Sequence, residues 1–129
     1  TLGSYGLRRV QGMPMPELRD ALADAMGNEM IDWLRGLPRH WISGNVAVTH
    51  AGADPALPID DQPWRNLIWG HPDFEKTPRA DGMWLVHGRT IVEEPVACDG
   101  RISIDTGAYV TGRLTAAHVQ PGALSFLST

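Results

Sequence analysis

The stretch "MWLVHGRTIVEEPVACDGRISID", residues 83–105, decides the fold that we expect for this chain. It holds three short runs with apolar residues, "MWLVH", "IVEEPVA" and "RISID" (83–87, 91–97 and 101–105). His-Gly-Arg separates the first two runs, and Asp99-Gly100 separates the last two. Short apolar runs bounded by Gly, Pro and Asp are typical of β-strands joined by turns. The stretch therefore predicts three strands, with His-Gly-Arg at a strand end.

The same pattern continues on both sides of this stretch. "WI" and "VAVT" flank the turn signal Ser43-Gly44-Asn45, which predicts a hairpin whose second strand ends at His50. After a glycine-rich loop, "TGAYVTG", two further strands follow, "RLTAAHV" and "ALSFLS" (113–119 and 123–128). We expect a mostly antiparallel or mixed sheet.

The helical part comes first in the chain. Between Pro16 and Gly36, apolar residues recur every four positions, which is the spacing of one helix face: Leu18, Leu22, Met26, Met30 and Leu34. We expect this face to pack in the core, and Asn28 to cap a second short helix after the break at Gly27. "WRNLIW" at 64–69 predicts one more helical turn. Helices followed by a sheet give an α+β fold in one domain.

Composition excludes several classes of protein. The chain has 129 residues, a net charge of −4 and no run of Lys or Arg, so it lacks the basic face that non-specific nucleic-acid binding needs. No apolar run approaches the ~18 residues of a membrane span. The single cysteine, Cys98, excludes an internal disulfide, which fits a reducing cytosol, and its thiol is expected to be inert. We expect a cytoplasmic protein without nucleic-acid or membrane partners.

Polar side chains follow three of the expected strands, in "VTHAG", "LVHGRT" and "IDTGAY". If these strands are neighbours, the following residues converge at one edge of the sheet: His50, His87, Arg89, Asp105 and Tyr109. Histidine can ligate a divalent metal, and arginine can hold phosphate oxygens as a fork. A lone strand-end histidine is more often structural, and the carboxylate in "DTGA" is expected to fix its turn. We expect the tryptophans to anchor core and loops rather than stack on a nucleotide (Trp41, Trp64, Trp69 and Trp84).

Four strings, taken in order, resemble the carboxy-terminal half of bacterial phosphoprotein phosphatases: "VAVTHAGADPALPIDDQ", "LIWGHPDF", "LVHGRTIVEEPV" and "RISIDTGAYVTGRLTA". These are calcineurin-like metallophosphoesterases, which include serine/threonine phosphatases and diadenosine tetraphosphate hydrolases. The resemblance implies that residues 1–129 form one half of an αββα sandwich. It also implies two divalent metals (manganese, iron or zinc) and a metal-activated water that attacks phosphorus. The implied substrate is a phosphoprotein, a small phosphoester or a dinucleoside polyphosphate.

The resemblance assigns roles to single positions. His50 matches a metal-ligating histidine of the family's "HAG", whereas His87 matches a histidine that is not the usual ligand. Arg89 stands where the family has a second ligating histidine. His71 stands where the family has a phosphate-holding arginine, and Tyr109 matches a tyrosine of the phosphate site.

Two departures from the family pattern put catalysis in doubt. A guanidinium has no lone pair to offer a metal, so Arg89 cannot replace the histidine. We infer that His71 or His87 supplies the ligand while Arg89 contacts phosphate; the alternative is a degenerate site. The family's Gly-Asp-x-His-Gly, Gly-Asp-x-x-Asp-Arg-Gly and Gly-Asn-His-Glu motifs are absent from the sequence. We therefore expect the chain to be the second half of an enzyme, inactive alone, or a phosphate-binding or scaffold protein of the same fold.

Overall fold

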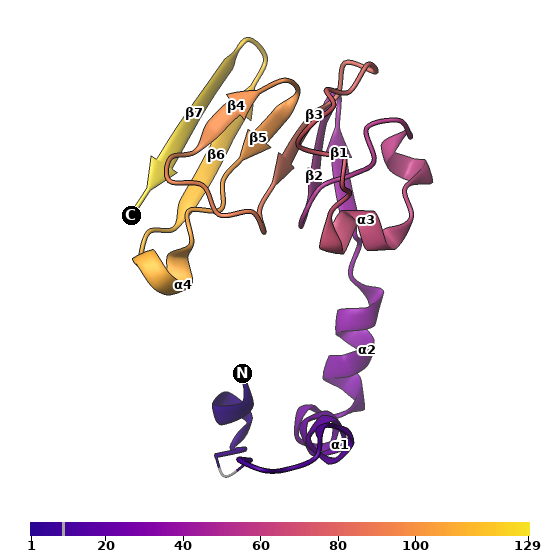
Figure 1. Ribbon diagram of the computed structural model, residues 1–129, viewed down its shortest axis with the longest axis vertical. Coiled ribbons are helices and arrows are strands. Elements are labelled where there is room, and N and C mark those ends of the chain that lie inside the picture. The colour runs from indigo at the N-terminus through magenta and orange to yellow at the C-terminus, as the bar shows by residue number, and fades with distance from the viewer. Residues whose placement is uncertain (9) are drawn as a thin grey trace. The chain divides into compact units, whose positions relative to one another are not determined.

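The computed structural model describes residues 1–8 and 10–129, which form two compact units, Thr1–Pro38 and Arg39–Thr129. The first unit is helical, and the second carries every strand of the described residues (Figure 1). Helices followed by a sheet confirm the α+β class. Within the described residues, no helix has the length and apolar character needed to cross a membrane.

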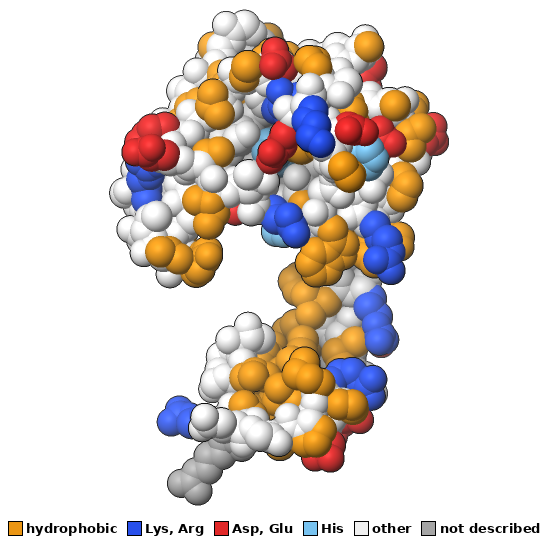
Figure 2. Space-filling view, viewed as in Figure 1, with side chains coloured by type: hydrophobic (Ala, Val, Ile, Leu, Met, Phe, Trp, Pro, Cys, Tyr) orange, Lys and Arg blue, Asp and Glu red, His pale blue; other side chains and the backbone are white. Residues whose placement is uncertain are grey.

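The helical unit consists of a 3₁₀ turn, η1 (Leu2–Tyr5), and two helices, α1 (Met15–Met26) and α2 (Asn28–Gly36). The predicted break is confirmed, but Gly27, with φ 76°, occupies the cap position, and no side chain caps α2. The prediction that Asn28 caps the helix was therefore wrong. No residue of α1 or α2 is buried, so the expected core face was also wrong. A 38-residue unit has too few side chains to enclose a helix face, and Figure 2 shows hydrophobic side chains on its surface.

The second unit contains a five-stranded sheet and a separate hairpin. The sheet has the order β1-β2-β3-β5-β4, and the hairpin pairs β6 with β7. The strands have the following bounds: β1 His40–Ser43, β2 Val46–Thr49, β3 Trp84–His87, β4 Val96–Cys98, β5 Arg101–Ser103, β6 Thr115–Gln120 and β7 Ala123–Ser128.

The three central strands are parallel. β2 pairs with β3 and β3 with β5 in the same direction, while β1 and β4 are antiparallel edge strands. The sheet is thus mixed, and its centre is not antiparallel. Parallel order matters for the site, because the carboxyl ends of β2, β3 and β5 all emerge at one edge.

Two segments differ from the predicted elements. The strand expected at 91–97 begins only at Val96, because Pro95 lacks the amide hydrogen that a strand interior needs. The loop expected at 106–112 contains a short helix, α4 (Ala108–Thr111). Gly107, with φ 68°, precedes it, and Gly112, with φ 75°, ends it.

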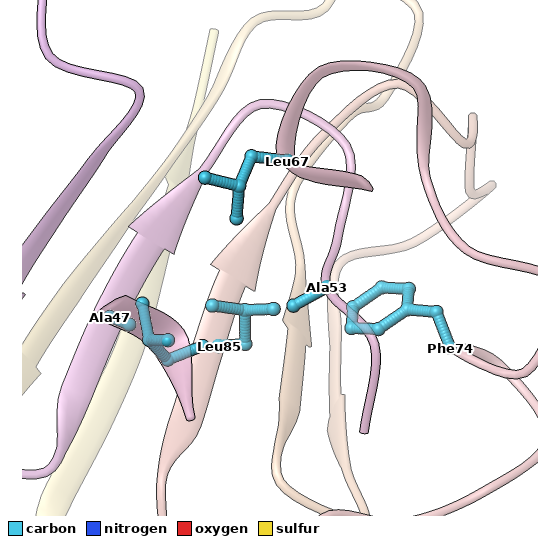
Figure 3. Packing of buried hydrophobic residues seen from close by; sticks show 6 residues of the cluster. Ala47, Ala53, Leu67, Phe74 and Leu85 are labelled. Carbon is cyan, nitrogen blue, oxygen red and sulfur yellow. The ribbon is translucent and has the colours of Figure 1, made fainter. Parts of the chain in front are cut away.

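One face of the sheet is covered by α3 (Trp64–Trp69) and by the loop segments around it, including the 3₁₀ turn η2 (Ile59–Asp61). Leu67 of α3 and Phe74 pack against Ala47 of β2, Leu85 of β3 and Ala53 (Figure 3). Ala47, Ala53 and Leu85 are fully buried. This cluster is the core of the unit, and it fixes the strands that carry the site.

The opposite face of β1, β2 and β3 and the β6–β7 hairpin line an open apolar cavity of about 1080 Å³. Trp41 and Trp84 lie along this cavity, and they remain 60% and 36% exposed. Trp64 and Trp69, at the two ends of α3, are 44% and 59% exposed. These four tryptophans were expected to anchor core and loops, and the part of this prediction that places them in the core was therefore wrong. The core next to α3 is built instead from smaller aliphatic side chains and Phe74.

Candidate functional site

The ends of the three parallel strands are joined by hydrogen bonds that continue past the strands. The Gly88 amide donates to the His50 carbonyl at 3.0 Å, and the Ile104 amide donates to the His87 carbonyl at 3.1 Å. His50, Arg89 and Asp105 therefore line one open cavity of about 270 Å³, called the strand-end cavity below. The predicted convergence of these three residues at one edge is confirmed.

Arg89 occupies an unusual backbone conformation in this cavity. Its φ is 63°, and the Thr90 amide donates to the Gly88 carbonyl at 2.7 Å, which closes a γ-turn around Arg89. A γ-turn with positive φ is rare and strained. Strained non-glycine residues cluster at functional sites, where the surrounding structure holds them. The turn fixes the point from which the Arg89 side chain leaves the backbone.

The Arg89 side chain lies against an indole. Its guanidinium carbon lies 5.9 Å from the ring centroid of Trp69. Across residues 1–8 and 10–129, no carboxylate lies within ion-pair distance of it. An exposed guanidinium without a carboxylate partner can bind an anion.

His87 also borders the cavity, but its ring is buried and both ring nitrogens have partners. Nδ1 lies 3.2 Å from the Gly88 carbonyl oxygen, and Nε2 lies 2.9 Å from the Ser103 hydroxyl. The ring meets Phe74 edge-on at 4.7 Å. Burial lowers the pKa of His87 below its ordinary value, partly opposed by the Gly88 carbonyl. To ligate a metal, His87 would have to give up one of these contacts.

His71 follows α3 and does not line the cavity. Its Nε2 lies 3.7 Å from the Asp54 carboxylate, and its Nδ1 accepts a hydrogen bond from the Asp73 amide at 3.3 Å. Both nitrogens thus face groups other than the cavity. His71 nevertheless lies on a segment next to Arg89, because Arg89 lies over Trp69, two residues before His71.

Tyr109 is not brought to the cavity. It lies in α4 and is 86% exposed, while the preceding residue, Ala108, lines the cavity. Asp105 has the turn role expected of it, since its Oδ1 accepts the Gly107 amide at 3.0 Å.

Arg113 lines the cavity and was missed in the sequence. One guanidinium nitrogen lies 2.8 Å from the Glu94 carboxylate, and another donates to the Glu93 carbonyl. The available signal was a basic residue directly after Gly112, at the start of the strand expected at 113–119. Arg113 is positioned by these contacts, and its charge is largely offset by Glu94.

The cavity carries charges of both signs and few groups that could ligate a metal. Arg89 and Arg113 face Asp105 as the one carboxylate of the lining, with His50 beside them. In the part of the chain that the structure describes, no group of three or more His, Cys, Asp or Glu is placed to hold a metal. Arg89 is the cation of the lining that can meet an anion, because Arg113 is paired with Glu94.

The sequence matches none of the protein-family models and none of the curated proteins with which it was compared. The chemistry of the site therefore rests on its own residues.

Proposed function

We propose that this chain forms one half of a metallophosphoesterase sandwich and contributes to the hydrolysis of phosphate monoesters or nucleoside polyphosphates. The observation that carries the proposal is the meeting of His50, Arg89 and Asp105 at three adjacent parallel strand ends, around one open cavity. The resemblance of the four sequence strings to phosphoprotein phosphatases supports the same function.

In this proposal Arg89 contacts the phosphate. Its guanidinium stays charged at any ordinary pH and presents a planar fork that fits two phosphate oxygens. It lies in the cavity without a carboxylate partner among the described residues, so no ion pair has to break before an anion binds. His50, whose exposed ring borders the same cavity, is the metal ligand that the family pattern assigns to this chain.

The described residues do not fit a pair of metal ions on their own. His50 is one ligand, one oxygen of Asp105 already accepts the Gly107 amide, and Arg89 offers no lone pair. Transition-metal sites need several ligands in a defined geometry. Any metal at this edge would need further ligands beyond these, and no catalytic step can be assigned to a metal from this geometry.

The same observations favour a second candidate, a phosphate-binding protein of this fold without catalysis. Two arginines line the cavity, and no cluster of metal-ligating side chains lies there among the described residues. Both functions share the phosphate contact at Arg89, and they differ in metal binding and turnover.

Titrating the full chain with inorganic phosphate by calorimetry tests the shared step. We expect Arg89→Met to weaken binding about 10- to 100-fold, because hydrogen bonds to charged groups contribute about 1.5–3 kcal/mol. Arg65→Met is the matched control: this arginine also lies against an indole, 5.1 Å from the Trp64 centroid, but lines no strand-end cavity. Equal loss in both variants, or no phosphate binding in the wild type, would overturn the proposal.

Two further measurements separate the candidates. Manganese bound per chain and hydrolysis of p-nitrophenyl phosphate, both measured after manganese loading on the product of the complete reading frame, report the enzyme. Phosphate binding that depends on Arg89, without metal uptake or turnover, supports the non-catalytic protein. Turnover that is lost in Arg89→Met and kept in Arg65→Met supports the enzyme.

A further inference from the structure

We propose that Trp69 makes the site selective for phosphate esters that carry a planar aromatic group, such as an aryl phosphate or a nucleotide. The proposal rests on the proposed function, because it takes Arg89 as the phosphate contact. It adds a specificity-determining residue and the chemical class of the group attached to the phosphate.

The position of Trp69 is the first observation. It is the last residue of α3, a helix that buries Leu67 in the core but leaves Trp69 59% exposed. An indole left this open presents ring surface that a ligand can reach. Gly70, with φ 89°, ends the helix directly after it, so the chain turns away there.

The second observation is the contact with Arg89. The guanidinium carbon lies 5.9 Å from the Trp69 ring centroid, and Arg89 also lines the strand-end cavity. The pair therefore places a π face beside a cation that can hold phosphate. Because 59% of Trp69 remains exposed with Arg89 in place, ring surface is available for stacking. Stacking between a ligand ring and an aromatic side chain tolerates different ring types, since every ring has a π face.

A second contact between a tryptophan and arginines allows a comparison with Trp69 and Arg89. Trp64 lies near both Arg65 and Arg39, at 5.1 Å and 5.8 Å. Neither of these arginines lines either cavity that the described residues form at the sheet. Trp64 is therefore a matched control: it offers an exposed indole and a nearby arginine without the strand-end cavity.

The test compares four ligands on the full chain by calorimetry: inorganic phosphate, glycerol 3-phosphate, phenyl phosphate and AMP. We expect phenyl phosphate or AMP to bind about tenfold more tightly than glycerol 3-phosphate, within the range that stacking on one aromatic side chain supplies. In Trp69→Leu this preference should fall below about twofold, while glycerol 3-phosphate affinity changes little. Trp64→Leu should keep the preference, and circular dichroism checks that each variant is folded.

The outcomes separate the two proposals. If inorganic phosphate does not bind, the proposed function fails and this inference fails with it. If phosphate binds but aromatic esters show no preference, or Trp69→Leu keeps the preference, only the inference is overturned. If Trp69→Leu weakens all four ligands equally, Trp69 merely holds Arg89, and the inference is also overturned. A Trp69-dependent preference supports it, and the stronger of phenyl phosphate and AMP identifies the attached group.

Discussion

Replacing His87 with alanine tests whether this histidine holds the strand end together. The substitution removes the contacts of its ring with the Ser103 hydroxyl at 2.9 Å and the Gly88 carbonyl at 3.2 Å. Each hydrogen bond contributes about 1 kcal/mol. The edge contact with Phe74 adds about 0.5–1.5 kcal/mol. We therefore expect a loss of about 3 kcal/mol in the free energy of unfolding.

Urea unfolding followed by tryptophan fluorescence measures this loss, because four of the five tryptophans lie in Arg39–Thr129. With a denaturant dependence of about 2 kcal/mol per molar, the midpoint should fall by about 1.5 M. His118→Ala is the control: His118 is exposed on β6, and its loss should change stability by less than about 0.5 kcal/mol.

The pH dependence gives a second measure of the same role. Burial lowers the pKa of His87 below its ordinary value of 6.5, so the unfolded chain binds the proton more readily than the folded one. The stability gained from neutral His87 is present above that value and is lost as the pH falls below it. The gap between wild type and His87→Ala should therefore be larger at about pH 8 than at about pH 5.5.

Two results would refute this reasoning. An unchanged urea midpoint in His87→Ala would mean that the contacts of the ring contribute little. A midpoint that manganese raises in the wild type but not in His87→Ala would mean that His87 ligates metal instead of holding the strand end.

Two further predictions concern the surroundings of the site. In Gly52→Ala, the new Cβ would lie 2.7 Å from the Phe74 ring, at a φ of 150°. Thermal unfolding should therefore show a loss of about 1–3 kcal/mol in the free energy of unfolding. Gly36→Ala, whose Cβ meets nothing within 4 Å, is the control, and equal stability of the two variants would contradict the packing at Phe74. The hydrogen bond to Asp99 raises the pKa of Cys98, so Asp99→Asn should speed iodoacetamide alkylation at about pH 8 while Asp24→Asn leaves it unchanged. An unchanged rate in Asp99→Asn would show that the thiol is not held by this contact.

Local signals in the sequence predicted local structure well. The turn at Gly44-Asn45 predicted the β1–β2 hairpin, and the strands expected at 113–119 and 123–128 correspond to β6 and β7. The parallel centre of the sheet was not predictable in this way, because β3 and β5 pair directly although β4 lies between them in the chain. Strand order is a long-range property, and no turn residue encodes it.

The candidate site was likewise predictable from the sequence only in part. A histidine, an arginine and an aspartate after three apolar runs were enough to predict that His50, Arg89 and Asp105 meet. The positions of Tyr109 and Trp69 depended on helices at the rim: α4 carries Tyr109 away from the cavity, and α3 leaves Trp69 exposed at its end. Residue type alone does not say which layer covers a tryptophan.

The charges that line this cavity bear on whether phosphate can bind there without a metal ion. The charge of Arg113 is offset by Glu94, which leaves Arg89 as the cation of the cavity lining without an ion-pair partner among the described residues, and Asp105 as the carboxylate of the lining. At about 6 Å and an effective dielectric of about 20, Arg89 by itself would repel a dication by about 5 kcal/mol and attract a phosphate dianion by the same amount, while the Asp105 carboxylate opposes both effects. We therefore expect phosphate to bind without metal where it lies closer to Arg89 than to Asp105. If phosphate binding required manganese, the negative charge of Asp105 would outweigh the attraction of Arg89 for the phosphate.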